Sequence, residues 1–108
     1  MEQQPSVGRI VHYKLTMDDA NAINKRRSEF VGGRTLNEPW NKGAQAHVGN
    51  FSQMGDDVPA IIIRVWPNEY GDKPGINAQV FLDGNDSLWI TSKEEGDKNG
   101  QWHWPERV

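Results

Sequence analysis

This chain of 108 residues has no cysteine, so it contains no disulfide, thiolate metal site or cysteine nucleophile. It also lacks a run of about 18 apolar residues, the length that spans a membrane as a helix. Its first residues have neither the basic nor the apolar segment of a secretory signal. The motifs of serine hydrolases, P-loop nucleotidases and zinc proteases are absent as well. These absences favour a cytoplasmic protein that binds rather than catalyses.

Acidic residues outnumber basic ones, but the two kinds are unevenly distributed. Seven of the 12 Lys and Arg residues lie within residues 1–50, whereas ten of the 15 Asp and Glu residues lie within 51–108. The second half of the chain would repel a phosphate backbone, which disfavours non-specific nucleic-acid binding. The length predicts a single domain over residues 7–108, preceded by a flexible leader at 1–6.

Alternation of apolar and polar residues predicts several short strands. The first covers residues 7–15, with Val11 and Tyr13 on one face and His12 on the other. The strand over 58–66 is apolar on both faces, so we expect it to be central and covered on both sides. The remaining strands are expected near 45–51, at 76–82, at 87–92 and around Trp102 and Trp104, with a hairpin turn at 83–86.

A helix is predicted from residue 17 to about residue 29. Thr16 and Asp19 have the spacing of an N-terminal capping box, with Asp in place of Glu. Gly32 and Gly33 are expected to end the helix, and residues 31–45 to form an irregular loop of the kind that often carries function. An apolar stripe would pack the helix on the sheet, and it consists of Met17, Ala20, Ile23 and Phe30.

Together these elements predict a mainly β protein of the α+β class. Five or six antiparallel strands, with one helix inserted after the first strand, would form a small SH3-like or related β-barrel. Curling towards a barrel is favoured because closure removes the exposed edges of a small sheet.

Five tryptophans are many for a domain of this size, which cannot enclose five indoles completely. Trp66, Phe81 and Trp89 lie on strand faces opposite the main apolar stripes. There a ring could stack on a nucleotide base while Arg64 grips a phosphate. The alternative, which we favour for Trp66 and Phe81, is a second core layer under the helix. The stronger ligand candidates lie in a loop or near the chain terminus: Trp40, Trp102 and Trp104.

A basic cluster is a second candidate binding site. Arg26 and Arg27 are adjacent in the predicted helix, and the two glycines that follow could turn Arg34 back towards them. Three guanidinium groups could hold a phosphate or an acidic partner. The alternative for each arginine is compensation of the helix dipole, with Arg26 paired to Glu29.

The three histidines could in principle perform acid–base chemistry on a phosphodiester. His12, His47 and His103 are far apart in the sequence, and hydrogen-bonded structural roles are the better interpretation. We therefore predict no catalytic residue and no cofactor, and keep His47 and His103 as candidate ligand-binding residues. Residues 83–86 lack the length and the closing Glu of a calcium loop, so no metal site is predicted.

Three segments form a specific pattern: Val-Gly-Arg-Ile-Val-His-Tyr at 7–13, Phe-Leu-Asp-Gly-Asn-Asp at 81–86 and Trp-His-Trp-Pro-Glu at 102–106. Within a likeness that extends from Val7 to Arg107, they resemble a family of small proteins encoded by tailed bacteriophages and prophages. The resemblance implies a phage gene product that acts in the cytoplasm of a bacterial host. It assigns no catalytic residues.

These observations predict a non-catalytic phage binding protein. The leading interpretation is an anti-defence protein that sequesters a small anionic nucleotide signal, with aromatic and Arg side chains closing the site at a homo-oligomer contact. The alternative is a protein–protein interaction module, either a virion accessory protein or an inhibitor of a host enzyme. That alternative predicts a flat, exposed aromatic patch. A hydrolase that uses His47 or His103 is the least favoured interpretation.

Overall fold

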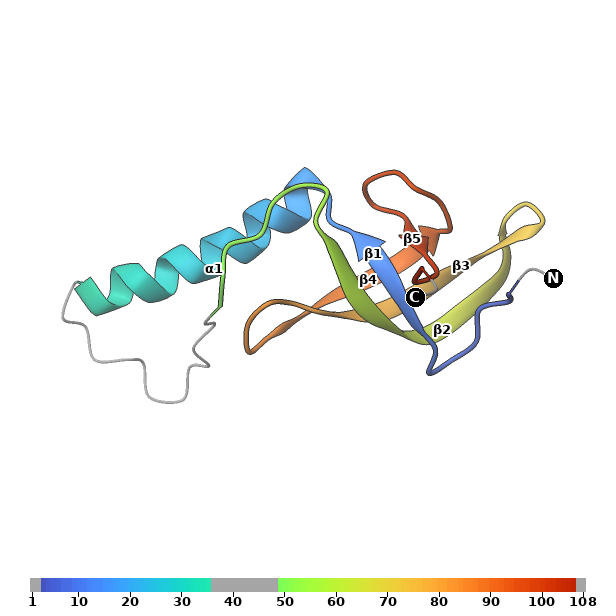
Figure 1. Cartoon of the computed structure of the whole chain (residues 1–108), viewed down its shortest axis with the longest axis horizontal. Coiled ribbons are helices and arrows are strands. Elements are labelled where there is room, and N and C mark those ends of the chain that lie inside the picture. Colours follow the sequence, from blue (N-terminus) through green and yellow to red (C-terminus); the bar gives the residue numbers. More distant parts are fainter. Residues whose placement is uncertain (1–2, 36–48, 107–108) are drawn as a thin grey trace.

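The computed structural model describes residues 3–35 and 49–106, and the side chains of 3–28 and 49–106 (Figure 1). The expected α+β, mainly β class with a helix after the first strand is confirmed. No helix in the described ranges is long and apolar enough to cross a membrane. The elements follow the order β1 (Ile10–Lys14), α1 (Met17–Thr35), β2 (Asp57–Tyr70), β3 (Lys73–Phe81), β4 (Ser87–Glu94) and β5 (Trp102–His103).

The five strands form one antiparallel sheet in the order β4-β3-β2-β1-β5. The predicted central position of β2 is confirmed. The sheet curls without closing into a barrel, because β4 and β5 are not joined by a continuous ladder. Within the described residues, the two edges meet at an isolated bridge between Glu95 and Trp102, beside which the Gly96 amide donates to the Trp102 carbonyl at 2.9 Å.

The concave face of the sheet holds the core. The alternation predicted for the first strand is confirmed, since Val11, Tyr13 and Leu15 are all fully buried. The inward face predicted for the strand at 76–82 is confirmed as well. The core residues contributed by the other elements are Ile23, Ala60, Ile62, Ile76, Ala78, Val80, Leu82, Ile90 and Trp102.

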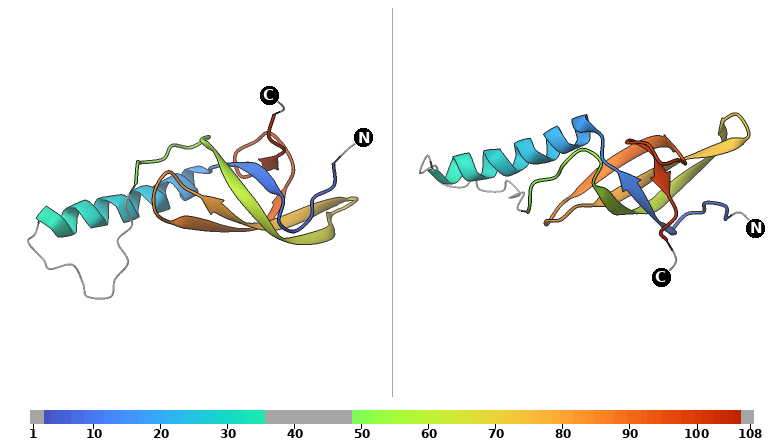
Figure 2. Two further views of the ribbon diagram at one scale, coloured as in Figure 1. Left: turned by 60° about the horizontal axis from the view of Figure 1, so that its bottom comes forward. Right: turned by 45° about the horizontal axis from the view of Figure 1, so that its top comes forward.

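The other face of the sheet is open, so the prediction that β2 is covered on both sides is wrong. Ile63 is 44% exposed, and Ile61 is half-buried. The reason is the course of α1, which extends away from one end of the sheet instead of lying over it (Figures 1 and 2). Apolar residues on the outer face of β2 therefore have no helix to pack against.

The start of α1 is fixed by the predicted capping box. The Asp19 amide donates to Thr16 Oγ1, and the Thr16 amide donates to Asp19 Oδ2, both at 3.0 Å. Ala20 and Ile23 are buried against the end of the core, but Met17 is exposed. The expected packing of a Met17-containing stripe on the sheet is therefore wrong, and Phe30 lies outside the described side chains.

The helix continues to Thr35, beyond the expected end near residue 29. Gly32 and Gly33 lie inside it, so the prediction that they end the helix is wrong. Glycine in a helix costs about 1 kcal/mol relative to alanine, which weakens a helix without forbidding it. Residues 31–35 of the irregular loop expected at 31–45 are therefore helical, and residues 36–48 lie outside the described part of the chain.

Of the strand expected near 45–51, residues 45–48 lie outside the described residues, and residues 49–51 make only an isolated bridge. The segment from Gly49 to Ser52 contacts both α1 and the hairpin between β3 and β4. The side-chain nitrogen Nδ2 of Asn24 donates to the backbone carbonyl of Ser52, and the backbone amide of Ser52 donates to Asn24 Oδ1, both at 2.8 Å. Gly49 makes an isolated bridge with Gly84. A Cβ at Gly49 would lie 2.3 Å from the Asp83 carbonyl oxygen, so this close approach requires glycine.

The Tyr13 hydroxyl joins the capping box to the core. It donates a 2.7 Å hydrogen bond to Asp19 Oδ2. Burial, followed by the hydrogen bond to Asp19 and the charge of Asp19, raises the pKa of Tyr13 above its usual value. A group whose pKa is higher in the folded chain contributes stability that is present below its unfolded pKa and lost as pH rises through its folded pKa.

We therefore expect Tyr13→Phe to change the alkaline stability profile. At neutral pH the variant should be about 1 kcal/mol less stable, because one hydrogen bond is lost. Above about pH 10 its free energy of unfolding should fall less steeply than that of the wild type, because it lacks the phenol that ionises in the unfolded chain and stays protonated in the folded one. Urea denaturation between about pH 8 and pH 11 measures both effects. Equal alkaline slopes for the two proteins would contradict this role of Tyr13.

Candidate functional site

Those predicted ligand-binding residues whose side chains the structure describes do not converge on one site. Trp40 and His47 lie outside the described residues. Arg34 lies in the last turns of α1, and its side chain is not described. The other predicted residues divide between two regions, one around Arg26 and Arg27 and one around Trp102, His103 and Trp104.

Trp102 is a core residue, so its prediction as a ligand-binding residue is wrong. Its side chain is fully buried, and its indole Nε1 donates to the Lys93 carbonyl at 3.0 Å. Trp104 packs against it edge to face, with ring centroids 5.5 Å apart. Trp102 therefore fixes the end of the chain to the core and leaves no ring face for a ligand.

Arg27 is also structural. Only 2% of its side chain is exposed, and its guanidinium makes two 3.0 Å contacts with the carboxylate of Asp86, itself 4% exposed. Arg27 Nε lies 3.5 Å from the Asn50 carbonyl. This fork-shaped pair occupies both oxygens of Asp86 and joins α1 to the hairpin between β3 and β4. The prediction that Arg27 grips a ligand is therefore wrong.

Arg26 is held differently from its neighbour. Its Nη1 lies 3.3 Å from Asp86 Oδ2, and 27% of its side chain is exposed. Its Nε and Nη2 are buried, and neither has a hydrogen-bond partner in the part of the chain that the structure describes. An unsatisfied buried donor costs about 1–3 kcal/mol. A ligand that accepts hydrogen bonds from Nε and Nη2 would remove this cost, so this edge of the guanidinium is a candidate binding group.

Arg26 lines a pocket of about 510 Å³ at the hairpin between β3 and β4, which we call the Arg26 pocket. Its other lining residues are Phe81, Leu82, Gly84, Asn85, Asp86 and Ser87. Phe81 is about half exposed and is the Cα partner of Ser87 across the hairpin. The pocket therefore combines an aromatic ring, hairpin backbone and a guanidinium edge.

Trp66 and Phe81 do not form the second core layer expected under the helix. No helix among the described residues covers the outer face of the sheet, and Phe81 is exposed there. Trp66 is satisfied within the sheet: its Nε1 donates to Asn77 Oδ1 at 3.0 Å, and the Arg64 guanidinium lies 4.2 Å from its ring centroid. Because Arg64 already covers Trp66, this pair offers little surface on which a base could stack.

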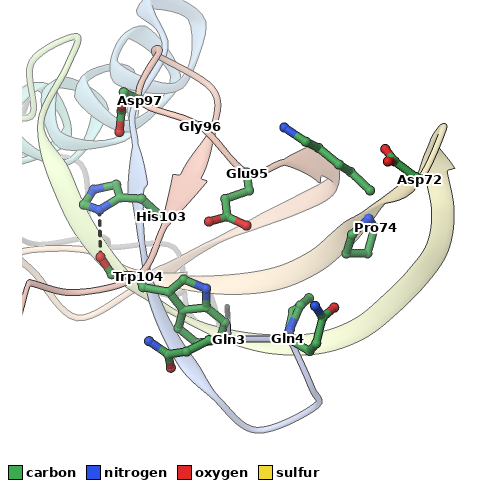
Figure 3. Close-up of a pocket in the computed structure, with 11 residues that line it drawn as sticks. Gln3, Gln4, Asp72, Pro74, Glu95, Gly96, Asp97, His103 and Trp104 are labelled. Carbon is green, nitrogen blue, oxygen red and sulfur yellow. Dashed lines mark hydrogen bonds between the residues drawn. The ribbon is translucent and has the colours of Figure 1, made fainter. Parts of the chain in front are cut away.

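Trp104 borders a second pocket of about 520 Å³, shown in Figure 3. The Arg9 guanidinium lies 4.8 Å from the Trp104 ring, and Trp104 Nε1 is buried without a hydrogen-bond partner among the described residues. Acidic side chains outnumber basic ones around this pocket, so it suits an anion less well than the Arg26 pocket. The charged lining residues are Asp72, Lys73, Glu95, Asp97 and His103.

His12, Asp57 and His103 form a cluster that the sequence interpretation missed. His12 and His103 are Cα partners on β1 and β5, and their rings meet edge to face with centroids 5.6 Å apart. The Asp57 carboxylate accepts from His103 Nε2, at 2.8 and 2.9 Å, and lies 3.4 Å from His12 Nδ1. We call these three residues the histidine cluster.

The hydrogen bonds of His103 define its protonation. Its Nδ1 lies 3.0 Å from the Trp104 carbonyl, and its Nε2 faces the Asp57 carboxylate. Both partners can only accept a hydrogen bond, which favours the form of the ring in which both nitrogens carry a proton. Burial lowers the pKa of His103, but the hydrogen bonds to Asp57 and to the Trp104 carbonyl outweigh it, so the pKa lies above its usual value.

Two sequence signals could have found these features. Ala20, Ile23 and Arg27 share the helical spacing that defines a buried stripe, which places Arg27 inward and Arg26 at its border. His12 alternates with buried Val11 and Tyr13, which places it on the outer face. Nothing local indicates that β5 pairs with β1, and that pairing is what brings His103 to His12.

Comparison of the chain with protein-family models, with curated proteins and with solved structures finds no match. The resemblance to phage proteins therefore stays a prediction. The function has to be argued from the geometry of the two sites.

Proposed function

We propose that this protein is a non-catalytic binding protein that holds a small anionic ligand of the nucleotide type in the Arg26 pocket. The observation that carries the proposal is the buried Nε–Nη2 edge of Arg26, which has no partner within the described residues. That edge carries two parallel N–H donors, the arrangement that binds a phosphate or carboxylate in a bidentate way once a ligand reaches it. The pocket volume of about 510 Å³ falls in the range of small-molecule sites.

The neighbours of Arg26 support this ligand class. Asp86 contacts Arg26 through Nη1 and is itself held by both nitrogens of the Arg27 fork. Arg27 therefore holds Asp86 in place, and Asp86 in turn holds Nη1 of Arg26. The Nε and Nη2 atoms of Arg26 remain for a ligand. Two guanidinium groups face one carboxylate here, which favours an incoming anion. The half-exposed ring of Phe81 provides a surface on which a base can stack.

The biological setting of the proposal rests on the sequence resemblance. A phage-encoded protein of this kind would act in the cytoplasm of an infected bacterium and would sequester a nucleotide signal of host defence. Sequestration requires tight binding without turnover, which fits a site built from a guanidinium and an aromatic ring. A second copy of the chain could complete the site, because symmetric contacts are common among small binding proteins.

Isothermal calorimetry tests this proposal with ADP-ribose, a cyclic dinucleotide and uncharged adenosine as probes. We expect saturable heat with at least one of the two phosphorylated probes and none with adenosine. Arg26→Gln should weaken binding by about 2 kcal/mol, roughly thirtyfold, because a charge-assisted hydrogen-bonded pair is lost. The matched control is Arg64→Gln, which removes the same charge at the Trp66 pair and should bind like the wild type.

Two outcomes would contradict the proposal. The first is the absence of saturable heat with both phosphorylated probes. The second is binding that survives Arg26→Gln but is lost in Arg64→Gln, which would move the site to the outer face of the sheet.

A second candidate function is a protein–protein interaction module, and the open face of the sheet favours it. Ile10, Ile61, Gln79 and Trp89 are successive Cα partners across four strands, so they form a continuous row. Ile10 is 54% exposed and Trp89 is 48% exposed. Three of the four side chains in this row are apolar, and exposed apolar side chains gathered on one surface are typical of contact surfaces.

Co-purification from infected bacteria separates the two candidates. If the row is a contact surface, a partner recovered with the wild type should be lost with Trp89→Glu and retained with Arg26→Gln. Sedimentation of the purified protein shows whether that partner is a second copy of this chain. Recovery of the same partner with Trp89→Glu would contradict this candidate.

A further inference from the structure

The histidine cluster has the composition of a metal site, although the sequence predicted none. His12, Asp57 and His103 each offer one ligand atom, and the three atoms lie within 4.8 Å of one another. Two imidazoles and one carboxylate are a ligand set used for zinc and other divalent transition metals. The cluster shares no residue with the Arg26 pocket, so the inference is independent of the proposed function.

The three residues come from adjacent strands of the sheet. His12 lies on β1, Asp57 begins β2 on one side of it, and His103 lies on β5 on the other side. His12 is the direct Cα partner of His103, and Asp57 is paired with Lys14, two residues along β1. Ladder hydrogen bonds hold the three backbones, so the side chains start from fixed positions.

The separation of His12 and Asp57 matches that of ligand atoms in a metal site, and the three ligand atoms lie within 4.8 Å of one another. Ligand atoms about 2.1 Å from a tetrahedral zinc ion lie roughly 3.4 Å from one another. The separation of His12 Nδ1 and Asp57 Oδ2 is 3.4 Å, and that of His103 Nε2 and Asp57 Oδ1 is 2.8 Å. Small rotations of the His12, Asp57 and His103 side chains would therefore let a metal ion bind between them and replace the proton on His103 Nε2.

The hydrogen bond of His103 to the chain supports the same interpretation. Metal-binding histidines usually donate their second ring N–H to a carboxylate or backbone carbonyl, which orients the ring. His103 Nδ1 has this bond, at 3.0 Å, to the Trp104 carbonyl (Figure 3). Its Nε2 is therefore aimed at Asp57 by the backbone and not by the carboxylate alone.

The basic side chain of Lys14, two residues from His12 on β1, is directed to the Asp97 carbonyl, and the site is open to solvent. Lys14 Nζ donates to the Asp97 carbonyl at 2.9 Å. The side chains of His12, Asp57 and His103 are 35%, 38% and 22% exposed. From these observations we propose that the histidine cluster binds a divalent transition-metal ion of the zinc type, with water or an anion in the position that faces solvent.

The test uses untagged full-length protein that has been freed of metal with a chelator. We expect calorimetry to show one Zn²⁺ bound per chain near neutral pH, and Zn²⁺ to raise the melting temperature by mass action. Co²⁺ in the same site should give visible absorption bands of a site with fewer than six ligands. Asp57→Asn, His12→Asn and His103→Ala should each weaken Zn²⁺ binding by about tenfold or more.

The matched control is Asp72→Asn, which removes the same charge at an exposed turn and should bind Zn²⁺ like the wild type. His12 and Asp57 are more than one-third exposed, so their variants should fold, which urea denaturation in chelator verifies. The proposal is overturned if Zn²⁺ gives no saturable heat. It is also overturned if binding persists in the His12→Asn and Asp57→Asn variants, because the cluster is then an ion-pair network between strands.

Discussion

Replacing Arg27 with methionine is expected to lower the free energy of unfolding by about 3 kcal/mol or more. Arg27 and Asp86 are almost fully buried, and two 3.0 Å contacts join them. Removal of the guanidinium takes two contacts from the buried carboxylate of Asp86. The other contact of Asp86 in this cluster, to Arg26, is longer at 3.3 Å. The substitution also removes the contact with the Asn50 carbonyl that helps to hold the segment after residue 48 against α1.

Urea denaturation of three variants separates this effect from ligand binding. Arg26→Met should cost much less stability than Arg27→Met, because Arg26 is more exposed and has one contact with Asp86. The double variant Arg27→Met with Asp86→Leu should recover part of the loss, since it removes the buried charges of Arg27 and Asp86 together. If Arg27→Met and Arg26→Met cost the same, the assignment of Arg27 to structure and Arg26 to binding would be wrong.

Replacing Trp102 with alanine should have a comparably large effect, about 3–5 kcal/mol. The indole is fully buried in the core, packs against Trp104, and donates to the Lys93 carbonyl at 3.0 Å. Its loss leaves a cavity where β5 joins β1 and removes the hydrogen bond to the Lys93 carbonyl of β4. Because small domains have a total stability of about 5–15 kcal/mol, this variant should be close to unfolding at room temperature.

Trp102→Phe is a milder variant that can be measured even if Trp102→Ala does not fold. It retains an aromatic ring and loses the Nε1 hydrogen bond, so it should cost about 1–2 kcal/mol. Urea midpoints of the wild type and both variants give the comparison. If Trp102 were instead a ligand-binding residue, Trp102→Ala would leave the urea midpoint unchanged and reduce ligand binding.

The strands could be predicted from the sequence because burial imposes a period of two. Val11, Tyr13 and Leu15 alternate with polar residues, and the same period appears from Ile76 to Leu82. The start of α1 could be predicted because Thr16 and Asp19 have side chains that bond its first amides. In each case the signal is local, and neighbouring residues carry it.

The end and the direction of α1 could not be predicted in this way. Gly32 and Gly33 lower helix propensity, yet the helix continues to Thr35 because propensity alone does not end a helix. Whether α1 lies over the sheet or extends from its end depends on packing between distant segments. Trp89 shows the consequence, since it faces solvent from an outer face that α1 leaves uncovered (Figures 1 and 2).

The sites show the same division between local and distant signals. Arg26 was predicted as a binding residue, but its separation from Arg27 depends on Asp86, which is about 60 residues away. The histidine cluster depends on the pairing of β1 with β5, which joins the two ends of the sequence. Loop-closing contacts of this kind leave no pattern in nearby residues.

The central claim is that the free edge of Arg26, and not Arg27, receives an anionic ligand. The most direct measurement is a ¹⁵N NMR titration of the protein with ADP-ribose that follows the side-chain Nε–H signals of both arginines. We predict a saturable shift of the Arg26 Nε–H signal together with the backbone amides of residues 84–87, while the Arg27 signal stays near its initial position. A titration in which the Arg26 signal does not move, or in which saturable shifts appear only around Trp66 or Trp104, would contradict the claim.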